Sequence, residues 1–218
     1  MTKPVALVIG AGPGVSGFVA KRWAREGYDV ALIGLDEEVL KTLAAEIEPL
    51  GVNVGWNPTD ITDEDALRAA VTRFGEYTGR IDVLHFNPSK YREADPLSLT
   101  PAQLDEDLRL GASGLLVCLQ AARPYMSAGA RVTATGSVAA DTPDPKAASL
   151  GVQKAALRNL IRSIDGTLES DGIRAVSLTV RGVLAREGGF TPERVAEAIY
   201  QAATQDEAGW RTEIPYDG

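Results

Sequence analysis

The chain has 218 residues, of which 44% are hydrophobic and 24% charged, a balance that we expect of one domain, residues 1–218, with a single core. Its formal net charge of −8 disfavours a protein that binds nucleic-acid backbones, because such proteins need a basic surface. The sequence lacks an apolar run of about 18 residues that would cross a membrane, and it opens on a strand rather than a signal peptide, so we expect a cytoplasmic protein.

Short apolar, β-branched runs alternate with longer segments of helical period, a pattern typical of βα units in a parallel sheet. The predicted strands cover residues 5–9, 29–33, 52–56, 83–86, 130–135 and 174–180, with a weak last candidate at 212–214. The predicted helices cover residues 15–26, 37–48, 63–77, 101–126, 147–170 and 192–204. Thr100 and Thr191, each followed by a proline, and Thr62 are predicted to be N-caps.

This alternation predicts a three-layer α/β fold. Because crossover connections are right-handed, we expect a doubly wound parallel sheet with the strand order 3-2-1-4-5-6-7. Ligands of such sheets bind in the crevice beyond the carboxyl ends of the strands. Functional residues are therefore expected just after strands one, four, five and six.

A glycine-rich turn follows the first predicted strand, with glycines at positions 10, 12, 14 and 17. Its last three glycines satisfy G-x-G-x-x-G, in which the backbone approaches a diphosphate closely and the helix N-terminus supplies N–H donors. We therefore expect Gly10, Gly12, Gly14 and Ser16 to bind the diphosphate of a dinucleotide in a Rossmann fold. The alternative is a turn that needs glycine only to pack the helix on the sheet.

The residue that would contact the adenosine ribose is Asp36, about 20 residues beyond the glycines. A carboxylate there accepts a hydrogen bond from a ribose 2′-hydroxyl and repels a 2′-phosphate, which favours NAD slightly over NADP. The alternative interpretation makes Asp36 the cap of the next helix.

Over nearly its whole length the chain resembles the short-chain dehydrogenase/reductase family. The turn fits the family's G-x-x-x-G-x-G except that Ser16 takes the last glycine position. Asp60 matches the first acid of the family's D-x-T-D, which implies a place near the adenine. Residues 81–89 resemble the family's I-D-V-L-V-N-N-A-G and keep, of its last four positions, only Asn87, which the resemblance assigns to cofactor binding.

The resemblance also implies a catalytic set, and that set is incomplete. Ser137 aligns with the family's catalytic serine and Lys154 with the lysine of Y-x-x-x-K, but Leu150 stands in the tyrosine position and Gly111 in that of the active-site asparagine. Positions four apart share a helix face, where the ammonium would lower the phenol pKa for proton transfer. Leucine cannot transfer a proton, and loss of a general acid removes about 10²- to 10⁴-fold of rate.

By resemblance, Lys154 holds the nicotinamide ribose and Ser137 polarises a carbonyl oxygen. The alternatives are a solvent-exposed lysine and a strand-end turn residue. Tyr91, on the loop after strand four, is the leading substitute proton donor, with a surface tyrosine as the alternative. We expect His85, the only histidine, and Cys118, the only cysteine, to be buried, the thiol being typical of a reducing compartment. The spacing of histidines and carboxylates indicates no metal site.

After strand six the sequence reaches Thr191 within a few residues of Arg181, whereas family members usually carry a long lid there. We therefore expect an open nicotinamide end. Arg181 is a candidate for binding a cofactor phosphate or an anionic substrate, with a surface salt bridge as the alternative.

These observations favour an NAD(P)-binding oxidoreductase that transfers hydride to or from a small carbonyl or alcohol substrate with an atypical proton donor. The alternative is a catalytically silent dinucleotide-binding protein with a structural or regulatory role. A flavin or nucleotide-sugar ligand on the same fold is a third possibility. We expect a homodimer or homotetramer through the helices at 101–126 and 147–170, and neither nucleic acid nor membrane as a partner.

Overall fold

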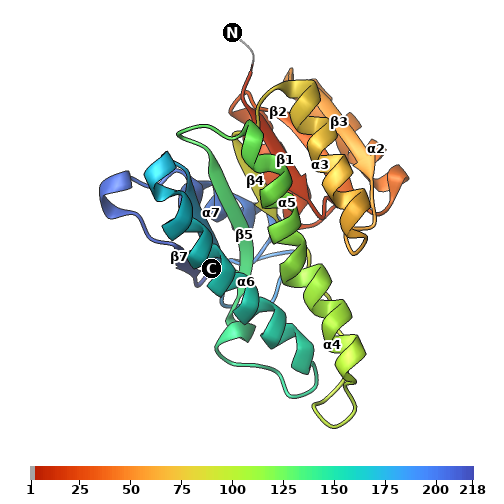
Figure 1. Ribbon diagram of the computed structural model, residues 1–218. Helices are drawn as coiled ribbons and strands as arrows, with labels where there is room; N and C mark the ends of the chain where they lie inside the picture. Colours follow the sequence, from red (N-terminus) through yellow and green to blue (C-terminus); the bar gives the residue numbers. More distant parts are fainter. Residues whose placement is uncertain (1–2) are drawn as a thin grey trace.

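The structure is a computed structural model that describes residues 3–218. Seven parallel strands form one sheet in the order β3-β2-β1-β4-β5-β6-β7 (Figure 1). This confirms the predicted doubly wound fold. Within the described residues, no helix has both the length and the apolar character that crossing a membrane requires.

The elements have the following bounds. The strands are β1 (Val5–Ile9), β2 (Asp29–Gly34), β3 (Val54–Pro58), β4 (Val83–Phe86), β5 (Arg131–Ser137), β6 (Arg174–Val180) and β7 (Glu213–Tyr216). The helices are α1 (Val15–Arg25), α2 (Glu37–Ile47), α3 (Glu64–Thr78), α4 (Pro101–Leu108), α5 (Gly114–Ala122), α6 (Ala148–Leu168) and α7 (Pro192–Ala203).

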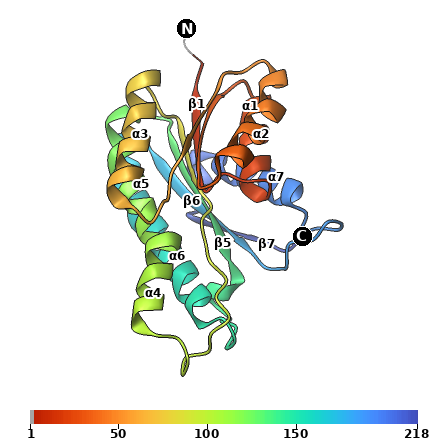
Figure 2. The same cartoon turned by 90° about the vertical axis from the view of Figure 1, so that its right-hand side faces the viewer.

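Helices cover both faces of the sheet, with α3, α5 and α6 on one side and α1, α2 and α7 on the other (Figure 2). Alternate residues of the central strands enter the two cores. Leu84 and Phe86 of β4 lie in the core under α5 and α6, whereas Val83 packs with α1 and α7. Every residue of β1 is buried, as a central strand covered on both faces requires.

The strands end close together at the carboxyl edge of the sheet. Ile9 pairs with Phe86, and Phe86 pairs with Ala134 of β5. Ser137 in turn lies beside Val180 of β6. The loops that follow β1, β4, β5 and β6 therefore gather at one edge, where the sequence predicted the functional residues.

Most predicted boundaries are confirmed to within two residues, and several points need correction. β3 covers Val54–Pro58 rather than 52–56, because the apolar pattern extends to Val52, which is buried but lies before the strand. The last strand covers Glu213–Tyr216 rather than 212–214. The predicted Thr62 cap is wrong: Asp63 caps α3 by accepting from the Ala66 amide at 3.0 Å.

The predicted helix at 101–126 is interrupted. Thr100 caps α4 in a capping box with Gln103, as its proline-flanked position indicated. A π-helical turn at Arg109–Ser113 then joins α4 to α5, and a short 3-10 turn ends the segment at Tyr125. Such single π turns are often found at functional sites. The extent of the segment was predicted, but its central turn was not.

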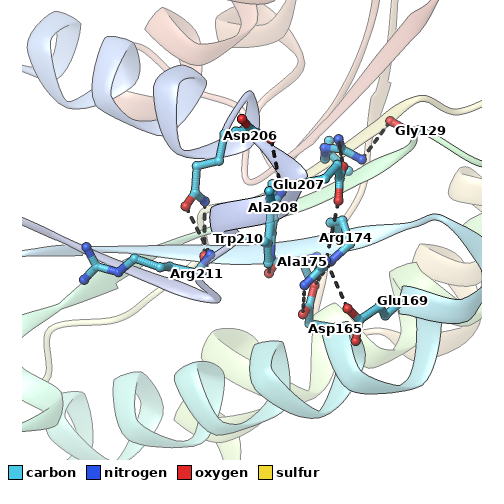
Figure 3. Close-up of polar contacts among 12 residues, drawn as sticks. Gly129, Asp165, Glu169, Arg174, Ala175, Asp206, Glu207, Ala208, Trp210 and Arg211 are labelled. Carbon is cyan, nitrogen blue, oxygen red and sulfur yellow. Dashed lines mark hydrogen bonds and ion pairs between the residues drawn. The ribbon is translucent and has the colours of Figure 1, made fainter.

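A buried polar cluster fixes the start of β6 relative to the segment that precedes β7 (Figure 3). Asp165 of α6 accepts from Arg174 Nε at 2.9 Å and Nη2 at 2.7 Å, and from the Ala175 amide at 2.7 Å. The Trp210 indole N–H donates to the Ala175 carbonyl at 3.3 Å, and Glu207 pairs with Arg174 at 3.5 Å. The cluster therefore joins α6, β6 and the approach to β7 away from the carboxyl edge.

Candidate active site

The glycine turn lies at the carboxyl end of β1. A side chain at Gly17 would overlap the Gly12 carbonyl oxygen, and one at Gly10, which has φ +75°, would lie 2.8 Å from Pro88 Cγ. Packing within the chain therefore accounts for these two glycines. At Gly12 and Gly14 an added Cβ would meet nothing within 4 Å, and neither residue has a positive φ. A ligand that approaches the backbone closely is a physical reason for glycine at both positions.

The first turn of α1 has no side-chain cap. Its N-cap is Gly14, whereas the side chains of Asp36, Asp63, Thr100 and Thr191 cap α2, α3, α4 and α7. Ser16 lies in this turn, so its backbone amide is among the uncapped donors. These amides and the positive end of the helix dipole suit an anion such as a phosphate group.

The end of β2 packs directly on the glycine turn. An added Cβ at Gly34 would lie 2.6 Å from the Ala11 carbonyl oxygen, so no acidic side chain fits at that position. Asp36 follows and caps α2, its Oδ1 accepting from the Glu38 amide at 2.9 Å and the Val39 amide at 3.1 Å. The cap interpretation is confirmed, and the contact with a ribose stays a prediction.

Asp60 and Asn87 follow β3 and β4. The hydroxyl of Thr62 donates to Asp60 at 2.7 Å and its amide at 2.9 Å, and these bonds lower the pKa of the exposed carboxyl group. The Asn87 amide donates to the Ile9 carbonyl at 3.1 Å, which places this residue beside the glycine turn. The Asn87 side chain makes no hydrogen bond within residues 3–218, so it is available to a ligand.

Ser137 ends β5 and is half-buried. Its hydroxyl oxygen accepts from the Ala139 amide at 3.1 Å. Because a hydroxyl has one proton and two lone pairs, this bond leaves the Ser137 proton free to donate to a ligand. The geometry therefore suits the predicted polarisation of a carbonyl oxygen.

Lys154 is 4% exposed and lies in the second turn of α6. Its ammonium group donates to the Thr135 carbonyl oxygen at 2.9 Å, two residues before Ser137. Burial lowers the pKa of Lys154 to about 8. The alternative of a solvent-exposed helix lysine is therefore wrong, and the side chain points toward the end of β5.

The helix turn that carries Lys154 is joined to the loop after β4 by a neighbouring glutamine. The Gln153 side chain accepts from the Lys90 amide at 3.1 Å and donates to the Lys90 carbonyl at 3.0 Å. It also fills the space beside Gly111, where an added Cβ would overlap Gln153 Oε1. The glycine in the π turn is thus matched to Gln153, a contact between residues distant in sequence that no local signal predicted.

Tyr91 is 61% exposed on this same loop. No hydrogen bond within residues 3–218 joins its hydroxyl to Ser137 or Lys154. The loop itself is held by Arg92, which donates to buried Asp107 through Nε and Nη2 at 2.8 Å each, and Asp107 also accepts from the Ser149 hydroxyl at 2.7 Å. This buried polar contact was not predicted from the sequence.

His85 and Cys118 are fully buried, as predicted. His85 Nδ1 lies 2.9 Å from the Thr133 hydroxyl. Burial, with a smaller contribution from the charge of Lys154, lowers the pKa of His85 to about 3, so the imidazole is neutral near pH 7. Burial also raises the pKa of the Cys118 thiol. Both side chains therefore belong to the core.

The segment after β6 is short and has no helix or strand before α7 begins at Pro192. Val183 and Leu184 in it are 86% and 49% exposed. Arg181 is exposed and its only ionic contact in the described chain is with Asp217 at 3.7 Å. The structure thus places Arg181 at the end of β6, on the far side of β5 from the glycine turn.

The structure brings most of the predicted residues to one edge of the sheet. The glycine turn, Asn87, Ser137 and Lys154 lie at or near the carboxyl ends of β1, β4 and β5. Asp36 and Asp60 follow β2 and β3 on one side, and Arg181 follows β6 on the other. An extended ligand along this edge would pass the two aspartates first, then the glycine turn, then the ends of β4 and β5, and Arg181 last.

Comparison with known proteins gives consistent matches. The profile of the family described as short chain dehydrogenase matches residues 4–186. Oxidoreductase asL5 of Sarocladium schorii is 31% identical over 176 residues, which cover 80% of this chain and 70% of the relative. Oxidoreductase UcpA of Salmonella typhimurium is 27% identical over 210 residues, which cover 95% of this chain and 76% of the relative.

Solved structures share the fold. A short chain dehydrogenase from Burkholderia cenocepacia in complex with NADP superposes with a TM-score of 0.88 at 26% identity, over 100% of this chain and 97% of that one. A dehydrogenase/reductase from Sinorhizobium meliloti gives a TM-score of 0.90 at 23% identity, over 100% of this chain and 95% of that one. With most of its length matched by the family profile, the chain belongs to the short-chain dehydrogenase family.

Proposed function

We propose that the protein is an NAD(P)-dependent oxidoreductase that transfers hydride to or from the carbonyl or alcohol carbon of a small molecule. The observation that carries this proposal is the open space at Gly12 and Gly14 beside the uncapped start of α1, a cradle that a Cβ would occupy. The dinucleotide would supply the hydride chemistry. The NADP complex of the Burkholderia cenocepacia relative supports a nicotinamide cofactor.

The residues at the edge divide the binding between them. The backbone N–H groups of Gly12 and of residues 14–16 bind the diphosphate, as the positive end of a helix dipole favours. Lys154 uses one of its three N–H donors on Thr135, which leaves two for the hydroxyls of the nicotinamide ribose. Asp60 lies on the adenine side and Asn87 beside the diphosphate. We favour NAD over NADP, because the Asp36 carboxylate repels a 2′-phosphate.

The proton donor is the atypical part of the proposed site. Ser137 donates a hydrogen bond to the substrate oxygen, which favours negative charge there. Leu150 lies one helical turn before Lys154, in the place of the family's tyrosine, and has no proton to give. We assign proton transfer to Tyr91, whose loop is joined to α6 through Gln153 and Lys90.

The test is to replace Leu150 with tyrosine. In a Tyr91→Phe background, which lacks the assigned donor, steady-state turnover of a carbonyl panel with NADH or NADPH is expected to rise by about 10²- to 10⁴-fold on Leu150→Tyr, since a general acid contributes that factor. The matched control is Thr167→Tyr in the same background, at an exposed position near the other end of α6, which is expected to change nothing. Equal turnover in the background and in both variants would refute the proposed role of position 150.

Cofactor binding is measured separately by the quenching of protein fluorescence with NADH and NADPH. Tight binding without turnover by the wild type, at every substrate tried, would favour the catalytically silent alternative. Absence of affinity for either nucleotide would overturn the proposed function itself.

We also propose that the protein forms a homodimer or homotetramer through α5 and α6. Leu116 of α5 and Val152 of α6 are large apolar side chains that are 41% and 43% exposed, and burying them favours association. Sedimentation equilibrium is expected to give at least a dimer, and Leu116→Glu with Val152→Glu is expected to yield monomers.

A further inference from the structure

A hollow of about 790 Å³ lies between α6 and β7. Strands β4, β5 and β6 separate β7 from β1, which the glycine turn follows. We call it the arginine trough. It is lined by two carboxylates and four guanidinium groups, those of Asp141, Arg158, Arg162, Arg181, Arg211 and Glu213.

The trough is open because the helical layer stops short of β7 on this face. α6 packs on β5 and β6, whereas α7 contacts β7 from the opposite face. Glu213 and Pro215 pair with Ser177 and Thr179 of β6, which alternate with the residues that pack under α7. The edge strand and the flank of α6 therefore form the two walls of the trough.

The charge of the trough is opposite to that of the whole protein. Four arginines and two carboxylates line it, an excess of two positive charges in a chain of net charge −8. Apart from Trp210 and Pro215 the lining is polar. A basic, polar recess of this kind attracts an anion with little apolar surface.

Two of the arginines are held in place by the chain. Glu213 accepts from Arg158 at 3.2 Å and from Arg162 at 2.7 Å. The Thr179 hydroxyl fixes the same carboxylate at 2.6 Å, and Arg158 also donates to Asp141 at 2.8 Å. These contacts preorganise two guanidinium groups, so that little conformational entropy is lost when a ligand binds.

The other two arginines are nearly unengaged. Arg181 reaches only Asp217, at 3.7 Å, with both side chains exposed. The Arg211 guanidinium makes no hydrogen bond or ion pair to any residue from 3 to 218, and Figure 3 shows it extending away from the neighbouring network. Its backbone is nevertheless fixed, because the Gln205 side chain bonds both its amide and its carbonyl at 3.1 Å.

We propose that the arginine trough binds a small polyanion that carries at least two phosphate or carboxylate groups. Guanidinium groups bind both kinds of oxyanion through paired hydrogen bonds, and a ligand with two such groups can contact more than one of the four arginines that line the trough. The trough shares Arg181 with the carboxyl edge of the sheet, but it contains none of the residues to which the proposed function assigns the dinucleotide.

Isothermal titration at low ionic strength tests the proposal, with pyrophosphate and citrate as the phosphate and carboxylate probes. For at least one probe we expect a site that persists in Gly12→Asp, and is therefore not the glycine turn, and that is weakened by about tenfold or more in the double variant Arg181→Gln, Arg211→Gln. Both side chains are exposed, and an unchanged circular dichroism spectrum and Tm would show that the variant folds. The probe that binds more tightly identifies the oxyanion class.

Two controls define the outcome that overturns the proposal. Arg73→Gln with Arg194→Gln removes the same charge from exposed positions on α3 and α7 and is expected to keep the affinity. Gly12→Asp, which blocks the glycine turn, is expected to keep it as well. No binding of either probe, an equal loss in both arginine double variants, or a loss confined to Gly12→Asp would refute the trough as the site.

Discussion

The glycine turn and the first turns of α6 lie at the same edge of the sheet. The backbone N–H groups at the helix start beside the turn have no side-chain partner within the described chain, whereas polar side chains of α6 are bonded to other parts of it. At the turn, the space beside Gly12 and Gly14 is open and no side chain caps the helix that follows. On α6, Ser149, Gln153 and Lys154 each bond to another part of the chain. The turn is thus prepared for a ligand, whereas α6 is fixed by internal contacts, so binding and positioning are separable by mutation.

The largest expected effect is a loss of stability when the buried contact between Asp107 of α4 and Ser149 of α6 is altered. Asp107→Asn removes the charge that pairs with Arg92 at a fully buried position, and the free energy of unfolding is expected to fall by about 3 kcal/mol. Urea denaturation measures it. The matched control is Glu106→Gln, the neighbouring exposed acid that also pairs with Arg92, with an expected loss of about 0.5 kcal/mol. Equal losses would show that burial of Asp107 is not what matters.

The glycine turn should respond in the opposite sense, losing affinity but not stability. Gly12→Asp places a side chain and a negative charge where the diphosphate would lie, and the Kd for NADH is expected to rise about 100-fold. The Tm should stay near that of the wild type, because the new Cβ meets open space. Gly166→Asp, at another open position, controls for the added charge. A large drop in Tm with unchanged Kd would assign Gly12 to packing.

The pair formed by Gly111 and Gln153 gives an intermediate effect. Gly111→Ala inserts a methyl group into the space of the Gln153 side chain, and the expected loss of stability is about 2 kcal/mol. Gln153→Ala in the same chain should recover part of it, so the double-mutant cycle yields a coupling energy. Gly166→Ala, at an open position of α6, is expected to cause no loss. Additive effects at 111 and 153 would contradict the contact.

The smallest expected effect near neutral pH is a pH dependence of stability that comes from His85. The folded-state pKa of about 3 lies below the usual value of 6.5, so the unfolded state binds the proton first as the pH falls. The neutral imidazole therefore costs no stability above pH 6.5, and stability falls by about 1.4 kcal/mol per pH unit between 6.5 and 3. Denaturation at pH 7, 6 and 5 measures the slope. It should flatten in His85→Gln, and an unchanged slope would assign it to other groups.

Local signals predicted the parts of the fold that depend on local chemistry. Thr100 and Thr191 cap their helices as their proline neighbours indicated, and the strand order followed from the alternation of elements. The start of β3 was missed because buried Val52 extends the apolar pattern beyond the ladder. β3 is a half-buried edge strand, so apolar and polar residues alternate only weakly along it. Its ends are set by its pairing with β2.

The sequence predicted which residues form the candidate site, but it did not predict the contacts that hold them in place. The glycine spacing and the lysine on α6 predicted which residues gather at the edge. The match of Gly111 with Gln153 and of Arg92 with Asp107 joins positions 42 and 15 residues apart, which no periodicity reveals. Of the four trough arginines, the sequence indicated only Arg181 as a candidate anion ligand, and the other three were missed because separate segments of the chain bring the set together.

The bond from Lys154 to the Thr135 carbonyl has a kinetic consequence. Because the ammonium is already anchored on β5, α6 does not need to rearrange or shed a competing side chain when a nucleotide arrives. Association should then be a single second-order step whose observed rate rises linearly with nucleotide concentration. A plateau in a stopped-flow experiment would reveal a slow rearrangement at this anchor.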